Sequence, residues 1–158
     1  MAKSQQGDLE GMKEIIHRVG IACSPGEVFD ALTTDEGLSR WWTTDTSGAG
    51  DLGSIIKFRF NGMGPDFEVV ELQTDSLVRW KHSGEMPGAW IGTEVSFQLK
   101  SDEKQTYVFF SHSNWKERSD FMGHCSTKWA VFLLSLKKAI EKGKGKPFPN
   151  DIHIDHDE

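Results

Sequence analysis

The sequence predicts an α+β fold in which a curved antiparallel sheet wraps around one long C-terminal helix. The first observation is a series of short segments, between residues 13 and 112, in which apolar and polar residues alternate with period two. The second is an apolar stripe with spacings of three and four residues from about 120 to 142. One face of an antiparallel sheet needs cover, and this last segment is the largest predicted helix.

A strand and two short helices are expected to open the domain. Residues 13–23 alternate in polarity and predict a strand. Residues 24–27, SPGE, combine a capping box with Pro at the first helical position, which is a specific helix start. This helix should end near Thr34. A second short helix should begin around Asp35 and run into the adjacent tryptophans at 41–42.

A run of about six strands is expected next. Turn-forming residues separate the alternating segments, among them the Gly-rich loop at 47–53 and the cluster NGMGP at 61–65. Short strands joined by short turns are typical of an antiparallel meander. The clearest alternating segments lie at 56–60, 67–72, 77–82, 94–99 and 106–112.

The last helix is expected from about Asp120 to Lys142. Lysines gather near its C-terminal end, where the helix dipole favours cations, and Gly143 ends it. Its apolar stripe comprises Phe121, Cys125, Trp129, Phe132, Leu136 and Ala139. A single domain is therefore expected over 13–150, between a flexible N-terminus (1–12) and a loose polar tail (151–158).

Composition narrows the class of protein. The net charge of −6 disfavours a nucleic-acid partner, because phosphates favour a basic face. The longest apolar run, residues 129–134, is too short to span a membrane. Cys23 and Cys125 form no CxxC pair, so a reduced, cytoplasmic protein is expected. The sequence contains neither a phosphate-binding loop nor a dinucleotide fingerprint, so no cofactor is predicted.

Four stretches carry a resemblance to a known family. They are CSPGEVFDALTTDEGLSRWWT (23–43), DLGSIIKFRF (51–60), FEVVELQTDSLVRWKH (67–82) and KWAVFLLSLKKAIEKGKGKPFPN (128–150). Their order and spacing resemble the START-like (SRPBCC) superfamily, and within it the homologues of the activator of the heat-shock-protein-90 ATPase. The resemblance implies a helix-grip fold with an internal cavity. Relatives bind lipids, sterols or polyketides, some are cyclases or hydratases, and others act as co-chaperones.

The cavity is expected between the concave face of the sheet and the last helix. Aromatic walls with few polar groups are typical of apolar ligand sites, although the same side chains could simply form the core. The candidate ligand-binding residues are Trp42, Phe58, Phe60, Phe67, Trp80, Phe97, Phe110, His112, Cys125, Trp129 and Phe132. Adjacent side chains point in different directions, so only one of two neighbouring rings should pack on a given surface. We expect Trp42 to face the cavity and Trp41 to anchor the segment.

Polar candidates are few. His112 has the inward parity of its strand, where it could orient a ligand or be a hydrogen-bonded core residue. Arg79 and Glu94 could face a ligand head or pair with each other. His124 is expected in solvent or at the pocket mouth, and Cys125 as a small buried hydrophobe rather than a nucleophile. The His and Asp residues of the tail lack a recognised ligand spacing, so no metal site is predicted.

Three functions remain open. The favoured one is binding of a small hydrophobic molecule in the cavity. The second is an enzyme of the cyclase or hydrolase type, in which His112 acts with Arg79 or Glu94. The third is chaperone regulation, which needs an exposed patch outside the cavity and is the least favoured. A homodimer through an edge strand or the two short helices is a further alternative.

Overall fold

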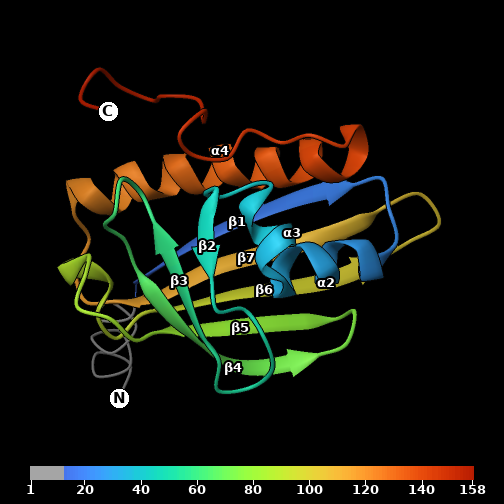
Figure 1. The fold of residues 1–158 in the computed structure, drawn as a ribbon, viewed down its shortest axis with the longest axis horizontal. Coiled ribbons are helices and arrows are strands. Elements are labelled where there is room, and N and C mark those ends of the chain that lie inside the picture. The colour runs from blue at the N-terminus through green and yellow to red at the C-terminus, as the bar shows by residue number, and fades with distance from the viewer. Residues whose placement is uncertain (1–12) are drawn as a thin grey trace, which may run out of the picture.

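The computed structural model describes residues 13–158 as a seven-stranded sheet with three α-helices (Figure 1). The predicted N-terminal segment, 1–12, lies outside the described residues. In chain order the elements are β1 (Lys13–Ile21), α2 (Pro25–Thr33), α3 (Asp35–Ser39), β2 (Asp45–Ser47), β3 (Ile55–Arg59), β4 (Asp66–Gln73), β5 (Leu77–His82), the 3-10 helix η1 (Gly88–Trp90), β6 (Glu94–Ser101), β7 (Thr106–Trp115) and α4 (Asp120–Lys142). The α+β helix-grip prediction is confirmed.

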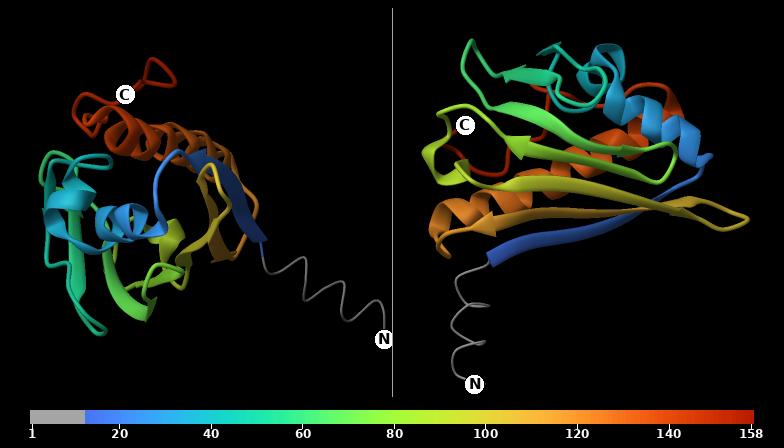
Figure 2. Two further views of the ribbon diagram at one scale, coloured as in Figure 1. Left: turned by 90° about the vertical axis from the view of Figure 1, so that its right-hand side faces the viewer. Right: turned by 90° about the horizontal axis from the view of Figure 1, so that it is seen from below.

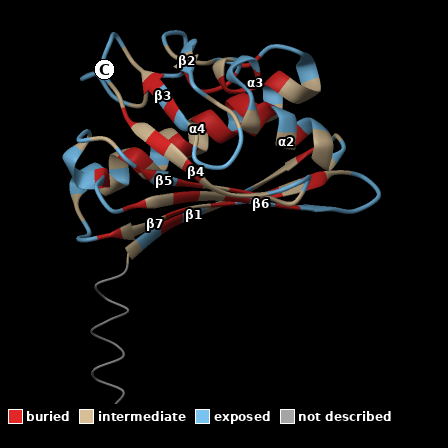
Figure 3. Cartoon of the chain, turned by 60° about the horizontal axis from the view of Figure 1, so that its bottom comes forward, coloured by how far each residue is buried: buried red, intermediate tan, exposed pale blue. Residues whose placement is uncertain are grey.

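The strands stand in the order β1-β7-β6-β5-β4-β3-β2, and each neighbouring pair is antiparallel. Buried and accessible positions alternate along the central strands (Figure 3). In β6, for example, Val95, Phe97 and Leu99 are buried, whereas Gln98 is exposed. The period-two pattern therefore reports a sheet with one covered face and one accessible face.

Local signals fix the two short helices. The Glu27 carboxylate accepts a hydrogen bond from the backbone N–H of Ser24 at 3.0 Å, which satisfies a free donor at the start of α2. The Thr34 hydroxyl accepts from the N–H of Gly37 at 2.9 Å and begins α3. A Cβ on Gly37 would lie 2.6 Å from Ala31 Cα, so glycine permits the close packing of α3 on α2.

The long helix α4 runs across the sheet, as Figure 2 shows from two sides. The Ser119 hydroxyl accepts from the N–H of Met122 at 3.2 Å, and Gly143 ends the helix at a φ of 82°. The buried residues of α4 are Cys125, Trp129, Phe132, Leu133, Ser135, Leu136 and Ala139. Phe121 departs from the predicted stripe: it is 40% exposed and stacks on His124 in the first turns of the helix.

Two segments differ from expectation. The edge strand β2 was not predicted, because its residues Asp45–Ser47 are all polar and show no alternation. Residues 151–158, expected to be loose, fold back along α4 (Figure 1). The fold-back begins at Phe148, whose N–H donates to the Trp42 carbonyl at 2.8 Å and whose carbonyl accepts from Thr44 at 3.1 Å. These backbone bonds turn the chain towards the helix.

Candidate ligand pocket

A pocket of about 350 Å³ lies between α4, the turn after α3, η1 and residues 148–158. Its wall combines aromatic rings with a smaller number of polar side chains. The lining residues are Trp42, Phe60, Trp90, Phe121, His124, Cys125, Lys128, Trp129, Phe132, Phe148, Asp151, His153 and Glu158. The volume falls at the lower end of the range for small-molecule sites in proteins.

Trp42 is at the centre of the aromatic wall. Its ring centroid lies 4.2 Å from that of Phe58 and 4.8 Å from that of Trp129. Trp90 lies nearly parallel to Trp129, with centroids 6.2 Å apart and planes inclined by 18°. Rings at these separations attract one another beyond the effect of buried area alone. The wall is therefore one continuous cluster of packed rings.

The adjacent tryptophans have different roles, as expected. The indole N–H of Trp41 donates to the Ala31 carbonyl at 2.9 Å, which ties the turn to α2. Trp42 lines the pocket, and Trp41 does not. The expectation that only one ring would pack on the same surface is wrong: both are buried, with centroids 6.0 Å apart and planes inclined by 14°. Both rings fit because α3 ends at Ser39, and in the turn that follows the two rings stack on each other.

His112 lies one layer behind the pocket wall and is fully buried. Its Nδ1 accepts from the indole N–H of Trp129 at 3.1 Å. An indole only donates, so the ring proton must sit on Nε2, which lies 2.9 Å from the Thr93 hydroxyl. That hydroxyl donates in turn to the Trp90 carbonyl at 2.6 Å. The neutral imidazole thus links Trp129 on α4 to the segment that carries Trp90.

This environment excludes a charged imidazole. Burial, with a smaller contribution from neighbouring His82, lowers the pKa of His112 to about 3. Both ring nitrogens already have protein partners. Of the two alternatives weighed from the sequence, the hydrogen-bonded core histidine is the one the structure favours. His112 positions two wall tryptophans and does not reach the pocket itself.

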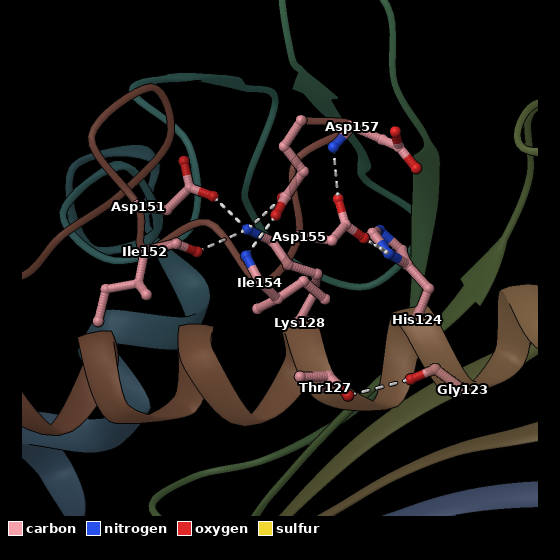
Figure 4. Close-up of polar contacts among 10 residues, drawn as sticks. Gly123, His124, Thr127, Lys128, Asp151, Ile152, Ile154, Asp155 and Asp157 are labelled. Atoms are coloured by element: carbon pink, nitrogen blue, oxygen red, sulfur yellow. Dashed lines mark hydrogen bonds and ion pairs between the residues drawn. The ribbon is translucent and has the colours of Figure 1, made fainter.

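The polar part of the pocket centres on Lys128, which points toward Asp151 and Ile152 in Figure 4. The Lys128 side chain is 14% exposed. Its ammonium contacts Asp151 Oδ2 at 2.5 Å, a Glu158 carboxylate oxygen at 2.7 Å and the Ile152 carbonyl at 3.0 Å. Burial opposes its charged form, but the two carboxylates outweigh burial and raise the pKa of Lys128. One turn away, His124 Nδ1 lies 3.5 Å from Asp155. Three of the polar side chains on the wall, Lys128, Asp151 and Glu158, are thus paired with one another.

The structure divides the predicted site residues into two groups. Five of them line the pocket: Trp42, Phe60, Cys125, Trp129 and Phe132. Six are buried in the core and are not on its wall: Phe58, Phe67, Trp80, Phe97, Phe110 and His112. Parity correctly placed these six on the covered face of the sheet. The rings of Trp42 and Trp129 lie over several of them and separate them from the pocket.

Several aromatic and polar residues of the pocket wall were not predicted from the sequence. Trp90 sits in a loop without periodicity, and Phe148 follows the helix-terminating glycines, so neither carried a pattern signal. Lys128 is flanked by the apolar stripe positions Cys125 and Trp129, and no sequence spacing marked it as part of a site. The one available signal was the acidic run that contains Asp151 and Glu158, which could have suggested a partner for a lysine on α4.

Arg79 and Glu94 lie outside the pocket. They pair with each other on the accessible face of the sheet, and Arg79 Nε also contacts Glu71 at 3.0 Å. These hydrogen bonds raise the pKa of Arg79 and lower that of Glu71. The pairing alternative is therefore the observed one. Arg79 and Glu94 are not available to the acid–base chemistry proposed with His112, which lies on the covered face.

Residues 13–158 offer little support for a cysteine nucleophile, a metal site or a membrane span. Burial raises the pKa of the Cys125 thiol to about 11, so it behaves as a small apolar group. Within the described part of the chain, no three His, Cys, Asp or Glu side chains come together as they would around a metal ion. None of the described helices is long and apolar enough to cross a membrane.

Comparison with known proteins places the chain in a family. The family model described as "Activator of Hsp90 ATPase homolog 1-like protein" matches residues 22–141. None of the curated proteins compared with the chain matches it significantly. Among solved structures, the solution structure of the Aha1 dimer from Colwellia psychrerythraea is 62% identical, with a TM-score of 0.79. The alignment covers 84% of this chain and 99% of that one.

More distant structures share the fold. A Staphylococcus saprophyticus protein is 17% identical over 84% of this chain and 95% of its own, with a TM-score of 0.66. CalU16 from Micromonospora echinospora is also 17% identical, over 82% of this chain and 75% of its own, with a TM-score of 0.68. At such identities the likeness concerns the fold alone. The family match and the 62% identical structure together show that this chain belongs to the family of Activator of Hsp90 ATPase homolog 1-like proteins.

Proposed function

We propose that the protein binds a small hydrophobic molecule in the pocket between α4 and residues 148–158. The observation that carries the proposal is a largely aromatic wall around about 350 Å³ of space. Apolar pockets with a few polar groups at one side are the usual form of small-molecule sites. Filling this one with an apolar ligand would remove further aromatic surface from water, which is favourable.

The geometry supports binding more than catalysis. An enzyme of the kind considered from the sequence needs an acid or base that faces the substrate. His112 is enclosed by Trp129 and Thr93, and Arg79 is held by carboxylates on the other face of the sheet. Of the titratable groups that line the pocket, Lys128, Asp151 and Glu158 are paired with one another. His124 Nδ1 lies 3.5 Å from Asp155, and His153 is exposed to solvent. Binding is therefore the function proposed.

Decanol is expected to protect Cys125, but not Cys23, from alkylation by iodoacetamide. Burial raises the pKa of both thiols to about 11, so their labelling rates differ through access rather than acidity. Cys125 lines the pocket and Cys23 does not. At ten times the dissociation constant, labelling of Cys125 should slow about tenfold. Mass spectrometry of the two peptides measures both rates. An equal effect on both thiols, or none, would overturn the proposal.

A homodimer is the second proposed property, supported by the 62% identical structure, which is a dimer. Sedimentation velocity at micromolar concentration should give twice the 17.8 kDa of one chain. A mass of one chain throughout the concentration range would remove this proposal.

The family name also supports a chaperone-regulating role. Adding the protein to purified heat-shock protein 90 should then raise its ATPase rate, and an unchanged rate would exclude that role.

A further inference from the structure

The pocket wall carries charged side chains, which a purely apolar site would lack. Lys128 lies on its wall, and the Lys128 ammonium sits 5.2 Å from the centre of the Phe132 ring. A lysine this far from solvent, 14% exposed, needs a carboxylate partner, because an unpaired buried charge is costly. Two carboxylates contact it, Asp151 and Glu158, and both also line the pocket.

The two carboxylates are held to different degrees. The Asp151 side chain is 4% exposed, and it follows a segment fixed by the two backbone hydrogen bonds between Phe148 and the turn at 42–44. Glu158 is more exposed, at 19%. Besides Lys128, its carboxylate accepts from the backbone N–H groups of Ile154 and Asp155, both within the same turn of the chain. Asp151 is thus the more deeply buried partner, and Glu158, whose other hydrogen bonds lie within its own turn, is the exchangeable one.

Resting on the binding function proposed above, we propose that the ligand is an amphipathic monocarboxylate whose head displaces Glu158 from Lys128. The apolar chain of the ligand then lies along the rings of Trp42, Trp129 and Phe132. The exchange leaves the charge around Lys128 unchanged, since one carboxylate replaces another. A doubly charged phosphate head would add a negative charge beside Asp151, which disfavours it. Residues 151–158 thereby act as a strap whose last carboxylate occupies the place of the ligand head.

Release of Glu158 breaks its contacts with Lys128 and with the N–H groups of Ile154 and Asp155, and returns the carboxylate to water, where it is well solvated. Partly exposed ion pairs contribute little net stability. The ligand head gains a charge-assisted hydrogen bond to Lys128 in the place that Glu158 leaves. Carboxylate binding and opening of residues 151–158 are therefore coupled: whatever weakens the Glu158 contact should strengthen the binding of an acid.

The test compares decanoate and decanol, which share a chain and differ in the head, by isothermal titration calorimetry below the micelle concentration. Decanoate should bind about tenfold more tightly, the effect of one charge-assisted hydrogen bond. Lys128→Met keeps the apolar stem and should abolish this preference while decanol still binds. Lys138→Met, on an exposed part of the same helix, is the matched control and should keep it.

Glu158→Gln tests the strap without leaving Asp151 unpaired. It should strengthen decanoate binding severalfold and leave decanol unaffected, whereas the exposed neighbour Asp157→Asn should change neither. Equal affinity of the wild type for decanoate and decanol, or an unchanged affinity of Glu158→Gln for decanoate, would overturn the carboxylate inference and leave the binding function standing. Failure of both probes to bind the wild type would overturn both.

Discussion

Replacing Trp42 with alanine is expected to lower the free energy of unfolding by about 4 kcal/mol. The ring is 3% exposed and packs against both layers of the molecule: Phe58 and Trp80 on the sheet, and Trp129 and Phe132 on α4. Truncation would leave a cavity continuous with the existing pocket, because the surrounding rings are themselves fixed by packing. The loss should therefore approach that seen for other large buried side chains.

Urea denaturation at pH 7 measures this effect. Phe109→Ala provides the matched control, since Phe109 is an aromatic residue on the accessible face of the sheet and is 36% exposed. It should lose about 1 kcal/mol or less, as exposed positions do. Decanol binding should also weaken in Trp42→Ala and remain unchanged in Phe109→Ala. If the two variants lost equal stability, Trp42 would not be the central packing residue described above.

The covered face of the sheet could be predicted from sequence because alternation directly reports one-sided burial. Phe58, Phe97 and Phe110 were placed on that face by parity, and the structure puts them there. Spacing also located α4 between Asp120 and Lys142. Alternation carries no information about depth, however. It could not separate a ring that touches the pocket, such as Phe60, from one covered by Trp42, such as Phe58.

The polar half of the pocket depends on contacts between residues far apart in sequence. Lys128 pairs with Asp151, 23 residues later, and with Glu158, 30 residues later. Neither spacing follows a helical or strand period, so the pattern of residues 151–158 indicated only a solvated tail. What brings them back is a backbone bond between Phe148 and Trp42. Such bonds leave no trace in side-chain patterning, because every residue except proline offers the same N–H.

Lowering the pH from 7 to 5 is expected to destabilise the protein by about 2 kcal/mol through His112 alone. The folded-state pKa of His112 is about 3, whereas an unfolded histidine titrates near 6.5. Between these values the unfolded chain binds a proton that the folded protein excludes, so stability falls as pH falls. The loss begins near pH 6.5 and is complete near pH 3. The loss of about 2 kcal/mol follows because pH 5 lies about 1.5 units below the unfolded pKa, and each unit is worth about 1.4 kcal/mol.

The physical cause is a clash of donors. Protonation would put a second N–H on His112, at Nδ1. This group would face the indole N–H of Trp129, which can only donate a hydrogen bond and cannot accept one. The measurement should stay above pH 5, because Glu71 and Glu141 also have lowered pKa values and their contributions to stability are lost only at more acidic pH. Within this window the histidine effect is separated from that of these two carboxylates.

His112→Gln removes the titrating group and retains a polar side chain opposite Thr93 and Trp129. It should be less stable than the wild type at pH 7, because a buried hydrogen bond is lost, yet its stability should change less between pH 7 and 5. Urea midpoints at both pH values give the comparison, and the remaining histidines act equally in both proteins. If stability fell as much between pH 7 and pH 5 in His112→Gln as in the wild type, His112 would not be held in the neutral, hydrogen-bonded form that links Trp90 and Trp129. The pocket wall would then owe its geometry to ring packing alone.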